Sequence, residues 1–443
     1  MIKNRTKKRV YLDYASTTPL DKRVKKAMDR FLDKDFGNAG SIYKEGMEAK
    51  KALGEARKKI AGVFKCKTEE IIFTSGGTES NNLAIIGVMN AIADLRGVNT
   101  RICADLKNFH IITTQIEHSS VLQCFKKLEK KGAQVSYIGV GQNGVVNPKD
   151  IENALRLNTV LVSVMYANNE IGTIQPIREI SKIIKSHNLQ TSKSVNLQTY
   201  KPCEKNSLGI FPQSGISQGK LRNLQTYFHS DASQAACYLD LNVERLGVDL
   251  MTIDGHKIYG PKGVGALFVK KGTTISKIME GGEQEMDLRP GTEPIPLIVG
   301  LSEALVIADS EREKEFARLS KLRDYFYSQI LKNLRIDTSG KKEKKIELNG
   351  EMENRLPNNL NIYVPGIDAE FAVIKLDEKG IACSAKSACL KDGSSYVVNA
   401  LNLGKERGKQ SLRFSLGRFT TKSEIDYAIK VLKTYFLVPK RII

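Results

Sequence analysis

The sequence predicts an α/β protein with a mostly parallel β-sheet flanked by helices, followed by a smaller α+β domain. The first observation is a pattern of apolar strand, polar turn and helix that occurs three times between residues 69 and 187. The second is a change of pattern after about residue 300, where a long helical stretch precedes shorter strands and helices. Strands that alternate with helices are typical of parallel sheets, because a parallel connection has to cross over and usually does so through a helix.

The elements of the first domain follow from apolar spacing. Residues 21–35 carry Val24, Met28, Phe31 and Leu32 at helical spacing, which predicts an amphipathic helix. Three strand–turn–helix units follow, then a strand with its polar tip, and then two strands joined by a polar turn. These segments are 69–88, 109–132, 158–187, 227–236 and 248–271.

The elements of the second domain are shorter, apart from the first. Residues 302–334 predict one long helix. Beyond it, strands at 358–364 and 411–417 alternate with helices at 368–380 and 421–436. The pattern predicts a smaller α+β domain, and the first 15 or so residues could pack with either domain.

The chain has 443 residues and a formal net charge of +20. Such a charge fits nucleic acid or another anionic partner, and it equally fits lysines spread over solvated faces. The sequence contains no long basic run and no alternation of basic with aromatic residues, which favours the second interpretation. We therefore expect no direct binding of nucleic acid.

Cysteine usage and hydropathy bear on the compartment. Seven cysteines are scattered without a CxxC pair, which favours a reducing environment. The sequence has no run of about 18 apolar residues, and its basic N-terminus lacks the apolar core of a secretory signal. We expect a cytoplasmic protein that does not associate with membranes.

Polar residues follow the predicted strands at the points where the strands end. In open α/β sheets these carboxyl ends lie along one edge, where ligands bind. The residues that we expect to gather there are Ser75–Thr78, Glu117–His118, Asn168–Glu170, Asp231–Gln234 and Asp254–Lys257.

These residue types suit one kind of cofactor when they are taken together. Gly77 and Thr78 lie in a glycine turn before a helix, which favours phosphate. Lys257 is a candidate for imine formation, and Asp231 ends an apolar strand, where a carboxylate needs a cationic partner such as a pyridinium nitrogen. His118 could stack on a flat ring or move a proton. Each residue alone has a plainer structural explanation, but the combination predicts a pyridoxal phosphate site.

At this point the sequence resembles a known family, the cysteine desulfurases of the NifS/IscS type, which are class V aminotransferases of the fold type I. The matching stretches run in order from residue 11 to residue 421 and include FTSGGTESNNLAI, IITTQIEHSSVL, YANNEIGTIQPI, HSDASQAA, DGHKIYGPKGVGAL, LRPGTEPIPLIVG, CSAKSACL and SLRFSLGRFTT. The resemblance implies a homodimer with a seven-stranded sheet in a large domain, residues 16–300. It implies a small domain formed by residues 1–15 and 301–443.

The resemblance also implies roles for individual residues. Lys257 would carry the pyridoxal 5'-phosphate and then move the Cα proton of the substrate, L-cysteine. Asp231 would keep the ring nitrogen protonated, and Gln234 would bond the ring hydroxyl. The residues that would bind the cofactor are Lys257, Gly77, Thr78, His118, Asn169, Asp231, Gln234, His256 and, from the second subunit, Thr292.

The remaining implied roles concern the substrate and the sulfur. Arg413 and Asn169 would bind the carboxylate of L-cysteine, since the planar guanidinium suits a carboxylate. Cys389 would attack the substrate's sulfur, leaving alanine and a persulfide. That sulfur would pass to an acceptor, either an iron–sulfur scaffold protein or a relay protein of tRNA thiolation. Cys383 is expected to be structural.

One departure from the family keeps other interpretations open. Asp254 stands where the family usually has a serine that bonds the phosphate, and a carboxylate repels a phosphate. Thr252 or another neighbour could replace that serine. A catalytically impaired scaffold for sulfur transfer is therefore one alternative, and a selenocysteine lyase or a class V aminotransferase is another.

The tetrapeptide NLQT occurs three times, at Asn188, Asn196 and Asn223. Joining the first copy to the last produces a sequence that resembles an uninterrupted family member. We therefore interpret residues 191–225 as an insertion that follows a helix ending near His187 and leads into the next strand. A disordered surface loop is the expected structure, and a docking or regulatory arm is the alternative.

Overall fold

The computed structural model describes five stretches of the chain, and the structural statements below refer to them. They are residues 9–95, 106–197, 225–334, 345–386 and 394–437.

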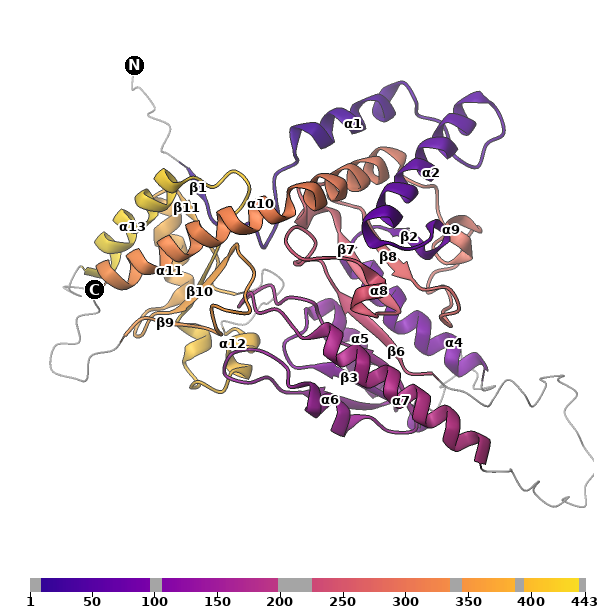
Figure 1. The fold of residues 1–443 in the computed structure, drawn as a ribbon. Helices are drawn as coiled ribbons and strands as arrows, with labels where there is room; N and C mark the ends of the chain where they lie inside the picture. Colours follow the sequence, from indigo (N-terminus) through magenta and orange to yellow (C-terminus); the bar gives the residue numbers. More distant parts are fainter. Residues whose placement is uncertain (1–8, 96–105, 198–224, 335–344, 387–393, 438–443) are drawn as a thin grey trace, which may run out of the picture.

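A seven-stranded sheet forms the centre of the larger part of the molecule (Figure 1). Its strands, in spatial order, are β2 (Ile71–Thr74), β8 (Gly265–Val269), β7 (Leu250–Asp254), β6 (Tyr227–Asp231), β5 (Thr159–Ser163), β3 (His110–Thr114) and β4 (Gln134–Ile138). The strands from β7 to β4 are parallel, and β8 runs antiparallel to both of its neighbours. The predicted α/β class and the mostly parallel seven-stranded sheet are confirmed.

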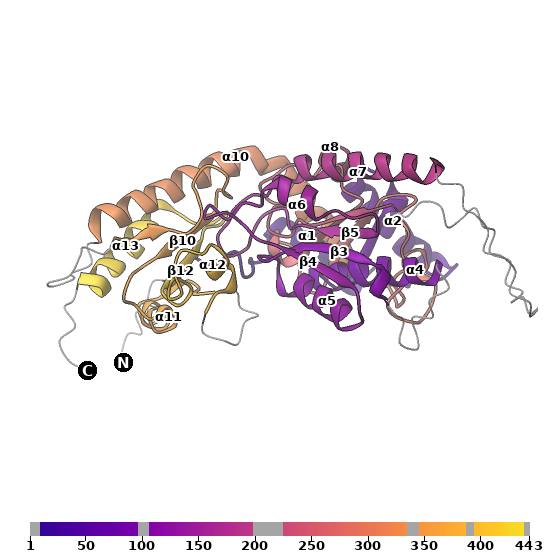
Figure 2. The ribbon, with the colours of Figure 1, turned by 90° about the horizontal axis from the view of Figure 1, so that it is seen from below.

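Helices cover both faces of this sheet, as Figure 2 shows. One side carries α6 (Pro148–Ala154) and α7 (Ile177–Leu197), and the other carries α5 (Ser119–Lys130) and α4 (Val88–Leu95). Alternate strand residues point into separate apolar cores: Ile112, Val162 and Met251 into one, Ile111, Leu161 and Leu250 into the other. This alternation follows from the two-residue period of a strand, and burial on both faces explains the apolar runs in the sequence.

A single helix, α10 (Ile295–Asn333), connects the larger part to the smaller one (Figure 1). It packs on α1 (Lys22–Asp33), α2 (Lys44–Phe64) and α13 (Lys422–Leu437). The side chain of Asp21 caps α1 by accepting the N–H of Arg23. The predicted apolar face of α1 is only partly buried, because Leu32 is 61% exposed.

The smaller part contains two sheets. In one, β10 (Asn359–Tyr363) pairs antiparallel with β12 (Ser411–Ser415) and β9 (Glu347–Leu348). In the other, β1 (Val10–Tyr11) pairs with β11 (Ile381–Ala382), so the start of the chain lies with its C-terminal part. This pairing agrees with a small domain formed by residues 1–15 and 301–443. The exact domain limits, including 16–300 for the large domain, stay a prediction.

The remaining elements are short. They are η1 (Thr68–Glu70), α3 (Gly77–Asn82), η2 (Leu83–Gly87), η3 (Leu106–Asn108), α8 (Val243–Leu246), η5 (Gly255–Lys257), α9 (Gln284–Asp287), α11 (Ala369–Glu378), α12 (Tyr396–Ala400) and η6 (Arg407–Lys409). Within the described stretches, no helix combines the length and apolarity needed to cross a membrane.

The helix α7 differs from the sequence prediction, which ended it near His187. It continues to Leu197, seven residues into the predicted insertion. The reason is local, since no glycine or proline interrupts the chain from Ile177 to Leu197. The rest of the insertion up to Gln225 lies outside the described residues, except for Gln225 itself.

Candidate active site

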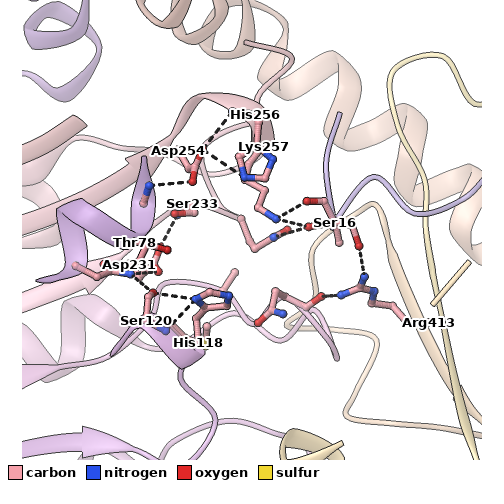
Figure 3. Close-up of a pocket in the computed structure, with 17 residues that line it drawn as sticks. Ser16, Thr78, His118, Ser120, Asp231, Ser233, Asp254, His256, Lys257 and Arg413 are labelled. Carbon is pink, nitrogen blue, oxygen red and sulfur yellow. Dashed lines mark hydrogen bonds and ion pairs between the residues drawn. The ribbon is translucent and has the colours of Figure 1, made fainter. Parts of the chain in front are cut away.

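The carboxyl ends of β2, β3, β5, β6 and β7 meet around one cavity of about 200 Å³ (Figure 3). Because these strands run in the same direction, their polar tips lie along one edge of the sheet. The cavity brings together the following predicted site residues: Gly77, Thr78, His118, Asn169, Asp231, Gln234, His256, Lys257 and Arg413. Thr292 is exposed and does not line this cavity, and Cys389 lies outside the described residues.

The glycine turn is built for close approach. Gly76 has a φ of +151°, which favours glycine. A Cβ on Gly77 would lie 3.1 Å from Asp254 Oδ2 and 3.2 Å from Ser233 Oγ. A side chain at this position would therefore crowd the cavity, which Gly77 and Thr78 both line.

Asp254 faces this turn. Its Oδ2 accepts the N–H of Gly77 at 2.8 Å, and its Oδ1 accepts the N–H of His256 at 3.2 Å. Burial by itself raises the pKa of the Asp254 carboxyl, but interactions with His256, the N–H of Gly77 and the charge of Lys257 together hold the pKa below its usual value. The side chain is therefore an anion turned toward the glycine turn.

Asp231 is buried at the end of β6 and is held through both carboxylate oxygens. Asn81 Nδ2 donates to Oδ2 at 2.8 Å, and the N–H of Ser233 donates to Oδ1 at 2.9 Å. These two contacts fix the plane of the carboxylate, so it can meet a cationic ring nitrogen in a defined direction.

His118 begins α5 and caps it. Its Nδ1 accepts the N–H of Ser120 at 3.2 Å and lies 2.8 Å from Ser120 Oγ. Since Nδ1 accepts, the ring proton of neutral His118 is on Nε2. The residue before it, Glu117, is fully buried, and burial raises its pKa to about 8.

Lys257 extends from η5 across the cavity (Figure 3). Its Nζ donates to the carbonyl oxygens of Ala15 at 2.8 Å and Ser16 at 2.7 Å. Gln234 donates to the same Ala15 carbonyl at 2.9 Å. The turn after β1 therefore closes the cavity on the side of the lysine.

Arg413 lies on β12 and reaches the cavity from the smaller part of the molecule. Its guanidinium donates to Asp13 Oδ1 at 2.7 Å, Ser16 Oγ at 2.9 Å and the carbonyl of Asn169 at 2.9 Å. Among the described residues, Arg413 Nε and Asn169 Oδ1 are buried without a hydrogen-bond partner. Both residues line the cavity, so a ligand there could pair with these atoms, a donor on Arg413 and an acceptor on Asn169.

The two ends of the segment that contains Cys389 are anchored beside the cavity. On one side, Ser384 exchanges backbone hydrogen bonds with Arg413. On the other, Ser395 Oγ donates to Glu170, the neighbour of Asn169.

The described cysteines are poor nucleophiles. Burial raises the pKa of Cys66, Cys124 and Cys237 to about 12, and it also raises the pKa of Cys383. A thiol with so high a pKa carries almost no thiolate at neutral pH. This agrees with the structural role expected for Cys383.

Several cavity residues were missed in the sequence. They are Ala15, Ser16, Asn81, Ser120, Met165 and Ala167. A signal existed for Asn81, which follows Gly77 by four residues and therefore shares its face of the helix. Ala15 and Ser16 lie in YLDYASTTPLD, which resembles the family, but no local pattern placed them at the cavity, because they contribute through contacts with residues more than 200 positions away.

The Aminotransferase class-V family model matches residues 10–192 and 203–428. The break between the two matched stretches falls inside residues 191–225, the segment interpreted as an insertion. A cysteine desulfurase IscS of Dictyoglomus turgidum is 41% identical over 429 residues, which are 96% of this chain and 94% of that protein. A cysteine desulfurase IscS of Methanosarcina thermophila is 38% identical over 427 residues, 96% of this chain and 91% of that protein.

Solved structures of related proteins also match this chain over most of its length. A NifS-like protein superposes with a TM-score of 0.78 at 31% identity, covering 97% of this chain and 99% of that one. The structure of SspA in complex with cysteine superposes with a TM-score of 0.69 at 28% identity, covering 93% and 100%. Because the family model and the relatives span nearly the whole chain, this protein belongs to the class-V aminotransferases and, within them, to the cysteine desulfurases.

Proposed function

We propose that this cysteine desulfurase holds pyridoxal 5'-phosphate in the cavity and transfers the sulfur of L-cysteine to Cys389. The observation that carries the proposal is the convergence of four groups on one cavity: the amine of Lys257, the doubly held carboxylate of Asp231, the ring of His118 and the buried guanidinium of Arg413. An aminotransferase reaction alone would need no nucleophilic cysteine, so the role proposed for Cys389 distinguishes the two activities.

The residues fit the cofactor at three of its parts. Asp231 would face the ring nitrogen, and His118 would lie against the ring. Lys257 would bond the cofactor's aldehyde carbon, releasing the carbonyls of Ala15 and Ser16. The backbone at Gly77 would face the phosphate.

Four further contacts belong to the proposal. Thr78, His256 and Thr292 of the second subunit would bind the phosphate, and Gln234 would bond the ring hydroxyl. The carboxylate of Asp254 would oppose the phosphate.

When bound, pyridoxal phosphate supplies a carbonyl that condenses with amines and a ring that withdraws electrons from the substrate's Cα. Arg413 and Asn169 would bind the substrate carboxylate, with the unpaired Arg413 Nε and the Asn169 side-chain amide Nδ2 as donors. Lys257 takes the Cα proton and later returns protons to the carbon skeleton. His118, with its proton on Nε2, is placed to pass a proton to or from the reacting groups.

The sulfur step balances without a further reagent. The Cys389 thiolate attacks the sulfur of the substrate, the carbon–sulfur bond breaks, and its electron pair stays on carbon, which takes a proton. The products are alanine and a persulfide on Cys389. We propose a homodimer in the cytoplasm, with an iron–sulfur scaffold or a tRNA-thiolation relay protein as acceptor, and no direct binding of nucleic acid.

A visible absorption spectrum tests this function. The purified protein should absorb in the visible range, the band should shift when L-cysteine is added, and alanine should form in the same tube. Cys389→Ser should keep the band and its shift but release no sulfide, with Cys383→Ser as the matched control that stays active. A protein that stays colourless with added cofactor would favour the impaired scaffold, and an active Cys389→Ser variant would favour a selenocysteine lyase or an aminotransferase.

A further inference from the structure

Asp254 places a carboxylate at the amide that a cofactor phosphate would need. The residue ends β7, and its side chain is only 14% exposed. Its Oδ2 lies 2.8 Å from the Gly77 nitrogen. The contact joins residues 177 positions apart, so it is a feature of the folded cavity and not of a local turn.

The donors that satisfy Asp254 are those that suit a phosphate. Besides the Gly77 amide, Oδ1 accepts the N–H of His256 at 3.2 Å and lies 3.5 Å from His256 Nε2. Backbone amides and an imidazole are common phosphate ligands. The carboxylate therefore completes its own hydrogen bonding with groups expected to serve the cofactor.

Two anions cannot share the Gly77 amide. A phosphate oxygen within hydrogen-bond distance of this nitrogen would lie about as close to Oδ2, because both would have to approach the same N–H. Like charges at such a separation repel strongly where water is excluded.

The hydroxyl groups of Thr252 and Ser233 do not remove the conflict. Thr252, on the same strand, is fully buried, and its Oγ1 lies 3.1 Å from His229 Nε2. It does not line the cavity. Ser233 does line it, but its hydroxyl lies beside the amide that Asp254 occupies.

We propose that Asp254 is an internal competitor of the cofactor phosphate: it occupies the Gly77 amide in the cofactor-free protein and has to leave it when pyridoxal phosphate binds. The inference rests on the proposed function. It concerns position 254, where this chain has an aspartate and the family usually has a serine. It follows that the phosphate contributes less to the affinity than it would beside a neutral residue.

The test compares two ligands that differ only by the phosphate. The cofactor-free full-length protein is titrated with pyridoxal phosphate and with pyridoxal, and the dissociation constants are measured from absorbance. Asp254→Asn, which keeps the shape and loses the charge, should bind pyridoxal phosphate at least about 10-fold more tightly while its affinity for pyridoxal changes less than about 2-fold. Asp254→Ser should behave in the same way. The second variant keeps the test valid if the first one fails to fold.

A control variant separates the phosphate from the ring. Asp231→Asn should weaken both ligands together, because Asp231 would face the ring nitrogen that both share. The inference is overturned if Asp254→Asn and Asp254→Ser leave the ratio of the two affinities unchanged, or lower the affinity for pyridoxal phosphate. If neither ligand binds to the wild-type protein or to these variants, the proposed cofactor itself is wrong, and the inference fails with it.

Discussion

At the scale of single residues, the direction of the Asp231 carboxylate depends on a residue that touches no reacting atom. Asn81 Nδ2 donates both to Asp231 Oδ2 and to Ser120 Oγ, each at 2.8 Å. Ser120 in turn lies 2.8 Å from His118 Nδ1. The Asn81 amide therefore positions the Asp231 carboxylate and, through the Ser120 hydroxyl, the His118 ring that would lie against the cofactor.

We predict that Asn81→Ala weakens the binding of pyridoxal phosphate. A hydrogen bond to a buried charged group contributes about 1.5–3 kcal/mol, so the dissociation constant should rise roughly 10- to 100-fold. The cofactor band should also shift, since the carboxylate would no longer hold the ring nitrogen in the same direction. An equilibrium titration of the cofactor-free protein measures both quantities.

The matched control is Asn82→Ala, the next residue along the helix. Its side chain donates to the carbonyl of Thr78 and does not line the cavity. If both variants bind the cofactor equally well, Asn81 has no positioning role.

At the scale of elements, α7 and β6 are joined across the predicted insertion. The side chain of Asn188 accepts the N–H of Thr226 at 2.9 Å and donates to its carbonyl at 3.0 Å. These residues belong to the first and the last copies of NLQT. The contact therefore links the first and last copies of NLQT, which would become one continuous stretch if the insertion were absent.

We predict that deleting residues 191–225 preserves the fold, cofactor binding and desulfurase activity. The deletion leaves the sequence NLQT, in which Asn188 stands three positions before the threonine, and asparagine side chains often bond backbone groups that close to them. Activity should stay within about 2-fold of the intact protein, and the melting temperature should not fall by more than a few degrees.

A particular outcome would contradict this prediction. If the shortened protein folds and binds the cofactor but no longer turns over L-cysteine, the segment takes part in the reaction as an arm. Substitution of Asn188 by Ala in the intact chain is the companion experiment, and it should lower the stability by about 1 kcal/mol.

The elements also show what the sequence could and could not predict. Strand ends such as Asp231 and turns such as Gly76–Thr78 were predictable, because strand–turn–helix order determines which residues meet at the sheet edge. The direction of the Asp254 side chain was not, since it depends on an amide 177 positions away. The length of α7 was underestimated because the comparison with an uninterrupted chain ended the helix early, although local composition allowed it to continue.

At the scale of the whole molecule, the larger and smaller parts share one cavity. Lys257 comes from the larger part, Arg413 from the smaller, and the turn at Ala15 and Ser16 contacts both. A change that alters the packing along α10, which connects the parts, would therefore alter the distance between the lysine and the guanidinium. Cofactor and substrate affinities should respond together to such a change.

The molecule also exposes apolar side chains near the predicted second-subunit residue. Phe36 is 73% exposed, Ile42 93% and Tyr43 59%. Their segment packs through Ala39 and Ala49 against Ile295, three residues after Thr292. Clustered exposed apolar groups are typical of protein interfaces, so this face suits contact with a second copy of the chain.

We predict that Thr292 serves the cofactor site of the other subunit. Thr292→Ala and Lys257→Ala should each lower the activity when made alone, the second to almost nothing. If the threonine acts across the interface, a hybrid dimer of one Thr292→Ala chain and one Lys257→Ala chain has one site with both defects and one site with neither. Co-expression with two affinity tags, followed by purification on both, should therefore yield about half of the wild-type activity per dimer.

The same hybrid gives a different result if Thr292 acts within its own chain. One site then lacks the lysine, the other lacks the threonine, and the activity stays at or below half that of the Thr292→Ala homodimer. A protein that remains monomeric at assay concentration would contradict the prediction before any hybrid is made, and size-exclusion chromatography with light scattering decides that point. Cofactor absorbance of the purified hybrid, read beside its activity, distinguishes a site that lacks pyridoxal phosphate from one that binds it without turnover.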